Sequence, residues 1–229
     1  MKISQQKSNT CFGTNIKFVA PEDFKNIRKS FLLTSASKDF IYDFDILNNC
    51  KTSRQCYRVN SPKCCTTEIK TCVGINVTNL KKKTSSFFAH FYHSVKNLNK
   101  LKIIQPHING DNAQIIGQRQ DRYAFSSEIY DTILNYCDAN NIPVTKMRGL
   151  KKGYEADLSY EGKTDTLFVC VSKINNKKKY VNNFEQLKYA FKEISLASCD
   201  NIQFLKEGSV HFDCNIFQKL YYMFLETLF

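Results

Sequence analysis

The chain has no tryptophan, and its 229 residues include only 8 glycines and 4 prolines. No apolar run approaches the length of about 20 residues that a membrane-spanning helix needs, so we expect no membrane span. Internal repeats, low-complexity tracts and glycine-rich phosphate-binding loops are also missing, which excludes repeat architectures and P-loop nucleotide sites. Hydrophobic residues still make up 42% of the chain, with 18 Phe and 12 Tyr. The composition therefore predicts a globular protein.

Acidic residues are few: 21 Asp and Glu stand against 33 Lys and Arg, for a formal net charge of +12. A surplus of this size favours polyanionic partners, above all nucleic acid, because Lys and Arg neutralise phosphates. Runs of lysine occur at 81–83, 151–152 and 177–179. If these runs converge in space they form a phosphate-binding face; solvated loop lysines are the alternative for each run.

Cysteine, in contrast, is plentiful: the chain has 10, and five of them lie between residues 50 and 72. They include no CxxC pair and enclose no histidine, so the spacing fits no zinc module. In a secreted protein they would form disulfides, and Asn76-Val77-Thr78 is a glycosylation sequon. The first residues contain no apolar signal segment, which favours a cytoplasmic or nuclear protein with free thiols. A secreted mature form stays open as the alternative.

Residues 126–173 carry the most information about the fold. We expect a helix that starts at the serines of this block and ends at Asn140-Asn141, because its apolar residues recur at helical spacing. Residues 154–160 alternate between apolar and polar side chains, which predicts a strand with one buried face. Residues 167–171 form the continuous apolar run of a central strand. A hairpin turn joins the two strands.

This order of helix, strand, turn and strand ending in lysine resembles the core of the restriction-endonuclease-like superfamily, the PD-(D/E)XK nucleases, and also the catalytic domain of tRNA-splicing endonucleases. The resemblance implies a metal-dependent nuclease in which Glu128 and Asp157 hold Mg²⁺ through carboxylate oxygens. Lys173 would then orient a water or offset charge on the phosphate. The family has a carboxylate two residues before the lysine, where this chain has Val171. An α+β domain without a catalytic site is the alternative.

Basic residues around this block are candidates for phosphate contacts. Arg119 and Arg122 stand beside Tyr123, a combination that holds phosphate and a stacked base in single-stranded RNA, so RNA is slightly favoured over DNA. The other predicted nucleic-acid-binding residues are Lys146, Arg148, Lys151, Lys152, Lys177, Lys178 and Lys179.

Three other functions stay open. His211 can act as the general acid or base of a metal-independent ribonuclease or ribotoxin. A non-enzymatic structural or interaction protein is the second alternative, with the nearly all-apolar helix expected at 215–228 docking a protein partner. The third is a cysteine hydrolase: Asn9-Thr10-Cys11-Phe12 resembles the nucleophile segment of ubiquitin-specific cysteine proteases, which makes Cys11 its candidate nucleophile.

Taken together, these patterns predict an α+β fold with a mixed sheet flanked by helices. We expect a cysteine-rich basic α+β region at 1–105 and an α/β domain at 106–229 with a restriction-endonuclease-like core. Residues 49–72 are expected to form a polar loop region. Further helices are expected at 21–33, 85–98 and 184–194, and further strands at 39–48, 73–77, 101–104, 113–116, 202–205 and 210–212.

Overall fold

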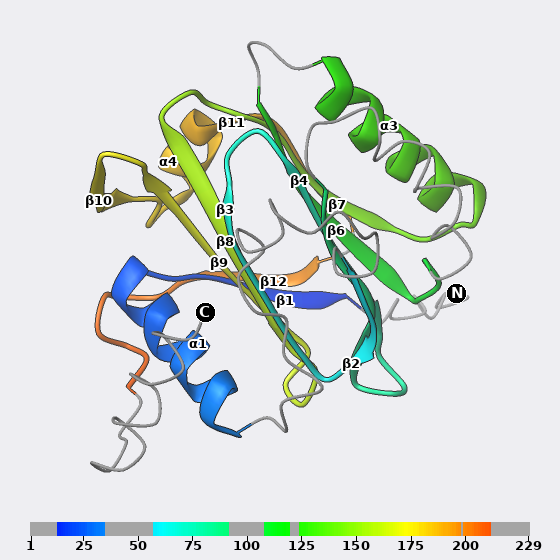
Figure 1. Cartoon of the computed structure of the whole chain (residues 1–229), viewed down its shortest axis with the longest axis horizontal. Helices are drawn as coiled ribbons and strands as arrows, with labels where there is room; N and C mark the ends of the chain where they lie inside the picture. The colour runs from blue at the N-terminus through cyan, green and yellow to red at the C-terminus, as the bar shows by residue number, and fades with distance from the viewer. Residues whose placement is uncertain (1–12, 35–56, 92–107, 120–123, 198, 212–229) are drawn as a thin grey trace, which may run out of the picture.

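The structure is a computed structural model that describes residues 13–34, 57–91, 108–119, 124–197 and 199–211. These residues form two six-stranded mixed sheets, named A and B, which pack face to face with helices on their outer faces (Figure 1). The expected fold class, which combines helices with mixed β-sheet, is confirmed. The strands are divided between two sheets, however, where a single sheet was expected.

Sheet A has the strand order β12-β1-β9-β8-β3, with β10 paired beside the end of β9. Strand β1 is parallel to both of its neighbours, and β8 is antiparallel to both of its own. The strands of sheet A are β1 (Thr14–Phe18), β3 (Lys63–Ile69), β8 (Tyr154–Glu161), β9 (Thr166–Lys173), β10 (Asn176–Tyr180) and β12 (Cys199–Phe204).

Sheet B has the order β11-β7-β6-β4-β5-β2, in which only β6 and β7 are parallel among the described pairs. Each sheet contains strands from both sides of residue 105, so the described elements do not separate into two units there. The strands of sheet B are β2 (Tyr57–Ser61), β4 (Val73–Asn79), β5 (Thr84–Phe91), β6 (Asn112–Arg119), β7 (Val144–Leu150) and β11 (Phe191–Leu196).

The main core lies between the two sheets. Because side chains alternate along a strand, every second residue of each sheet points into this layer. Leu158 and Val169 of sheet A share one buried cluster with Ile116 and Met147 of sheet B. This inter-sheet layer joins the two halves of the sequence into one core.

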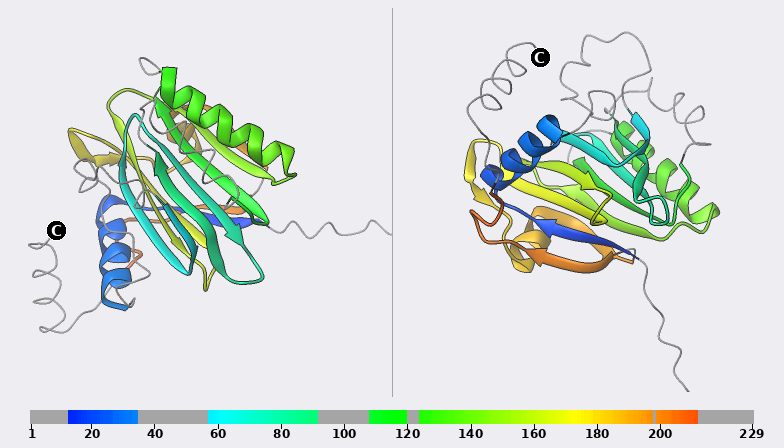
Figure 2. Two further views of the ribbon diagram at one scale, coloured as in Figure 1. Left: turned by 45° about the vertical axis from the view of Figure 1, so that its right-hand side comes forward. Right: turned by 90° about the horizontal axis from the view of Figure 1, so that it is seen from below.

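The helices cover the outer faces. Helix α1 (Pro21–Thr34) packs its apolar stripe against Cys65 and Cys170 on sheet A. Helix α3 (Ala124–Ala139) packs on the outer face of sheet B. Figure 2 shows these two helices on opposite sides of the sheets. The short helix α4 (Phe184–Ala190) precedes β11. No described helix is long and apolar enough to cross a membrane.

Several expected elements are corrected. Residues 49–72 were expected as a loop, yet β2 and β3 occupy 57–61 and 63–69. The helix expected at 85–98 is strand β5 as far as Phe91, because a strand buried on both faces carries apolar residues at nearly every position and so also matches helical spacing. The helix expected at 184–194 ends at Ala190, where β11 begins.

Other expectations are confirmed. The helices expected at 21–33 and from 126 are α1 and α3. Of the last predicted hairpin, 202–205 falls largely within β12, whereas Val210 and His211 are not in a strand. The stretches 39–48, 101–104 and 215–228 lie outside the described residues. The remaining strands, expected at 73–77, 113–116, 154–160 and 167–171, are β4, β6, β8 and β9.

The cysteines and the sequon can now be placed. The described cysteines are buried except for Cys199, which is partly exposed. Burial raises the pKa of the Cys137 thiol to about 12, so it stays protonated at neutral pH. Asn76 of the sequon is 0% exposed and donates a 2.6 Å hydrogen bond to Gln114. The folded protein therefore does not present this asparagine for glycosylation.

Candidate nucleic-acid interface

Glu128, Asp157 and Lys173, the predicted catalytic set, lie on three different faces. Glu128 is exposed on α3, outside sheet B. Asp157 lies on the outer face of sheet A, where its Oδ1 accepts a 2.8 Å hydrogen bond from the Glu68 backbone N–H. Lys173 lies at the end of β9 on the inner face, with its Nζ 5.8 Å from the centroid of the Tyr154 ring. The structure does not bring these side chains together, and Glu128 and Asp157 do not fit a shared Mg²⁺ ion.

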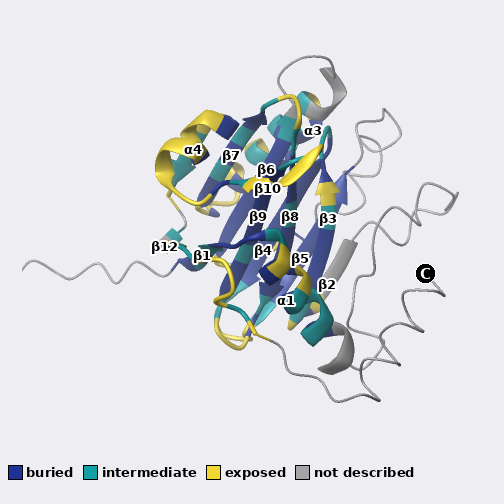
Figure 3. Cartoon of the chain, turned by 90° about the vertical axis from the view of Figure 1, so that its left-hand side faces the viewer, coloured by how far each residue is buried: buried dark blue, intermediate teal, exposed yellow. Residues whose placement is uncertain are grey.

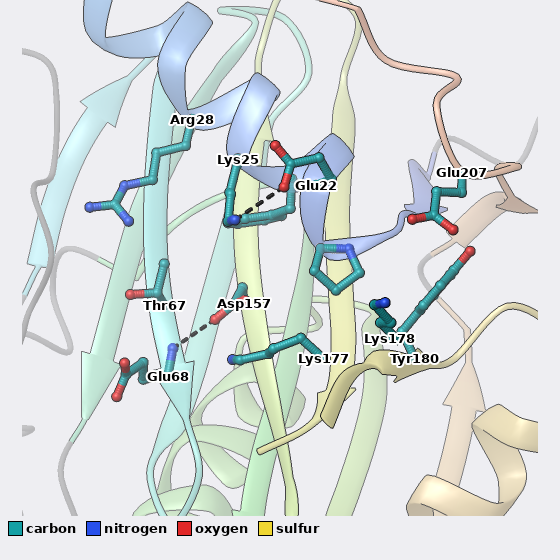
Figure 4. A pocket seen from close by; sticks show the side chains of 12 residues that line it. Glu22, Lys25, Arg28, Thr67, Glu68, Asp157, Lys177, Lys178, Tyr180 and Glu207 are labelled. Carbon is teal, nitrogen blue, oxygen red and sulfur yellow. Dashed lines mark hydrogen bonds and ion pairs between the residues drawn. The ribbon is translucent and has the colours of Figure 1, made fainter. Parts of the chain in front are cut away.

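Asp157 instead lines a hollow of about 450 Å³ beneath α1, which we call the α1 hollow (Figure 4). Four of its lining residues are acidic and four are basic, so their formal charges cancel. Within the described residues, no group of three His, Cys, Asp or Glu side chains is placed to hold a metal ion. The lining residues are Pro21, Glu22, Phe24, Lys25, Arg28, Thr67, Glu68, Asp157, Lys177, Lys178, Tyr180 and Glu207.

Ion pairs hold two of the four cations of the α1 hollow. Lys177 reaches from β10 toward Glu68 and Asp157 (Figure 4) and forms an ion pair with Glu155, a carboxylate that is only 2% exposed. Desolvation lowers the pKa of Lys177. Lys25 pairs with Glu22 on α1 at 3.0 Å. Because Lys25 and Lys177 are already paired and four carboxylates line the α1 hollow, it is a poor site for a polyanion.

The opposite side of β10 has a different character. Two adjoining hollows of about 350 and 250 Å³ share Tyr154 and Lys173, and their described lining contains no Asp or Glu. Their lysines form no ion pair with any carboxylate of the described chain. Figure 3 shows many exposed residues on β10 and α4 beside them. We define the lysine–tyrosine surface as Lys151, Lys152, Tyr154, Lys173, Lys178, Lys179, Tyr180 and Tyr189.

Backbone hydrogen bonds hold the segments of this surface together. The turn between β7 and β8 is closed by a 3.1 Å bond from Tyr154 N to Lys151 O, and Gly153 takes φ +86° there. Lys151 N donates to the carbonyl of Ala190 at 2.8 Å, which joins this turn to the end of α4. Ile174 N donates to Gly153 O at 2.9 Å, which joins it to the turn after β9. Three separate chain segments thus present their side chains together.

Tyr189 is the most exposed aromatic group of the surface. Its side chain on α4 is 59% exposed. The Lys151 ammonium lies 3.3 Å from its ring centroid, and the Tyr154 ring meets it edge-on at 6.4 Å. A hydrogen bond and the charge of Lys151, with a smaller contribution from Lys173, lower the pKa of the Tyr189 phenol. The same two lysines would also face an anion bound at this surface.

The remaining predicted binding residues lie elsewhere. Arg148 is held under α3 by Asp131 at 2.8 Å and by Ser127 and Gln118. Lys146 shares its face of β7, two residues earlier. Of the predicted set, only Lys151, Lys152, Lys178 and Lys179 belong to the lysine–tyrosine surface, joined by Lys173 from the predicted catalytic set.

Some candidates cannot be placed in a site. His211 is exposed, after β12, in a segment without regular secondary structure. Cys11, Arg122, the side chain of Arg119 and the expected C-terminal helix lie outside the described residues.

Sequence reasoning missed the tyrosines of the surface. Tyr189 precedes Ala190 in a segment whose other aromatic residues, Phe184 and Phe191, were assigned to an apolar stripe. An aromatic residue off such a stripe, next to Lys188, was the available signal. Tyr154 was interpreted only as a residue of the buried strand face. In sequence comparisons, no protein-family model matches the chain and no curated protein matches it.

Proposed function

We propose that the protein binds nucleic acid through the lysine–tyrosine surface. The observation that carries the proposal is the composition of the two adjoining hollows: five lysines, three tyrosines and no described carboxylate. Unpaired ammonium groups bind backbone phosphates and release their counterions, and exposed aromatic rings stack on bases. The net charge of +12 supports the same class of partner.

The α1 hollow differs in charge from the neighbouring lysine–tyrosine surface. Its Lys25 and Lys177 form ion pairs with carboxylates, so these two lysines contribute to the stability of β10 and α1 more than to anion binding. A nucleic acid strand is therefore expected to follow the β9–α4 side of β10. Lys178 and Tyr180 line hollows on both sides of β10, but only the α1 hollow is also lined by carboxylates. This difference in the surrounding charge makes the proposal specific to a surface and not only to net charge.

Cleavage forms no part of this proposal. The resemblance of residues 126–173 to restriction-endonuclease-like proteins implies a metal-dependent step, but Glu128, Asp157 and Lys173 occupy separate faces. We therefore assign them no common reaction. The resemblance supports nucleic acid as the ligand and leaves the nuclease activity as an untested expectation of the sequence.

The test compares two variants that each remove two lysines. Lys151→Ala/Lys152→Ala changes the lysine–tyrosine surface, whereas Lys81→Ala/Lys82→Ala changes an exposed turn whose neighbour Lys83 lies against Gly162 at the other end of β8. The length of β8 separates the two sites by roughly 23 Å. Fluorescence anisotropy across a salt series measures affinity and salt slope. We expect the first variant alone to weaken binding and to reduce the slope for a single strand by up to about 1.4.

Two results would contradict the proposal. Equal losses in the two variants would mean that binding follows net charge without a defined site. An absence of binding by the wild-type protein at low salt would remove nucleic acid as the partner.

A further inference from the structure

The shape of the lysine–tyrosine surface also indicates the form of its ligand, an inference that rests on the proposed function. We propose that the two hollows hold two successive unpaired nucleotides of a single strand, with the base in one hollow stacked on Tyr189. Lys173 contacts the phosphate that joins the two nucleotides. The ligand class is thus single-stranded nucleic acid, and duplex is excluded from this mode of binding.

The lysines are distributed over both hollows and their junction. The hollows meet at Tyr154 and Lys173, which line both. Lys151 and Lys152 line only the 250 Å³ hollow, and Lys179 lines only the 350 Å³ one. One cation therefore stands at the junction and others at each side, so each of three consecutive phosphates of one strand would have a lysine to contact.

Tyr189 supplies the stacking platform. Lys151 covers one face of its ring, and Tyr154 meets it edge-on. With the side chain 59% exposed, much of the remaining ring surface faces solvent. A base stacked on this ring would lie close to the ammonium groups that bind its phosphates. Such stacking needs an unpaired base, because the faces of paired bases are covered by their neighbours in the helix.

Amide side chains line both hollows and can bond to the edges of bases. Asn175 and Asn176 line the smaller hollow, and Asn182 and Gln186 line the larger. Gln186 Oε1 accepts a 3.0 Å bond from Asn182 N, which orients the amide at the start of α4. Asn and Gln side chains can bond to the Watson–Crick edges of bases, which are free only in single strands.

The experiment compares a short fluorescent oligouridylate, its deoxy counterpart and a duplex of the same length, each bound by wild-type protein, Tyr189→Ala, Tyr189→Phe and Phe184→Ala. Phe184 is the matched control, since it is also exposed on α4 but packs against Phe204 at 5.1 Å, outside the two hollows. We expect wild type to prefer the single strands. We expect Tyr189→Ala to weaken single-strand binding roughly ten-fold, with duplex binding unchanged. Tyr189→Phe and Phe184→Ala should bind like wild type.

Equal effects of Tyr189→Ala on single strand and duplex, or no effect on either, would overturn the inference. If Lys151→Ala/Lys152→Ala still abolished binding in that case, the proposed function would stand and the stacking arrangement would fail. Failure of the wild-type protein to bind any of the ligands would overturn both. The ribose and deoxyribose ligands differ only at the 2′-hydroxyl and in the base methyl group where thymidine is used, so a preference between them identifies RNA or DNA as the ligand.

Discussion

His90 of β5 illustrates how one residue couples the fold to pH. It is 2% exposed between the sheets, and its Nδ1 lies 2.8 Å from Thr66 Oγ1 on the facing sheet. Desolvation lowers its pKa from 6.5 to about 4, against a smaller raising effect of Glu68. Histidine at this position therefore stays neutral in the folded protein at pH values where it is protonated in the unfolded chain.

This shift predicts a loss of stability on acidification. The unfolded state binds the additional proton below pH 6.5, so stability declines from there toward pH 4 and the contribution then levels off. From about pH 7.5 to about pH 5.5 we expect His90 to lower the free energy of unfolding by about 1.4 kcal/mol. Urea denaturation of wild type and His90→Gln at both pH values measures it. An equal pH dependence in the two proteins would contradict the assignment.

At the same scale, the candidate site was only partly predictable. Four of the five lysines of the site were expected, because lysine runs and net charge can be read directly from the sequence. Lys173 was grouped with Asp157, whereas the structure places the two on different faces of sheet A. Tyr189 was missed because its exposure depends on where α4 ends, and sequence patterns locate such ends poorly.

Among the elements, the connection from sheet A to sheet B passes so close to β6 that one position of this strand requires glycine. The chain passes from β3 to β4 at Cys72, whose carbonyl accepts a 2.9 Å bond from Gln118 N. A Cβ on the preceding Gly117 would lie 2.3 Å from that same carbonyl oxygen, and Gly117 also has φ +124°. Glycine at this position lets the connection pass close to β6.

We therefore expect Gly117→Ala to be the more damaging of two glycine substitutions. Gly153→Ala, at φ +86° with no atom within 4 Å of the added Cβ, carries only the conformational cost of about 1–2 kcal/mol. Gly117→Ala adds the backbone clash, so its loss should be larger, about 3 kcal/mol or more. Chemical denaturation of both variants tests this. Similar losses would show that the approach of Cys72 O does not constrain β6.

Prediction of the elements succeeded most clearly where apolar and polar residues follow a single period. Strand β8 alternates cleanly, and α1 has a single apolar stripe, so both were placed correctly. It failed at β5, where Phe87 packs toward α3 and Phe88 faces the inter-sheet layer. A strand covered on both faces has no period of two to detect, and its apolar residues match a helix equally well.

For the whole molecule, the pairing of distant strands decides which basic runs meet. The runs 151–152 and 177–179 come together because the β7–β8 turn and the β9–β10 turn lie at one end of sheet A. The run 81–83 follows β4 and lies at the other end, where Lys83 approaches Gly162. The sequence shows where the lysine runs are, but it does not show which of them lie close together in the fold. That depends on contacts between distant strands, which leave no local sequence pattern.

The most direct test of the account maps where nucleic acid lies on the protein. A photoreactive oligouridylate is cross-linked to the protein at low salt, and the modified peptides are identified by mass spectrometry. The account predicts cross-links in the β7–β8 turn around Tyr154 and in the segment from Lys173 to Tyr189, and their loss in Lys151→Ala/Lys152→Ala. Cross-links concentrated at residues 81–83, around Arg148 or on residues 22–28 of α1 would contradict the assignment of the lysine–tyrosine surface as the binding site.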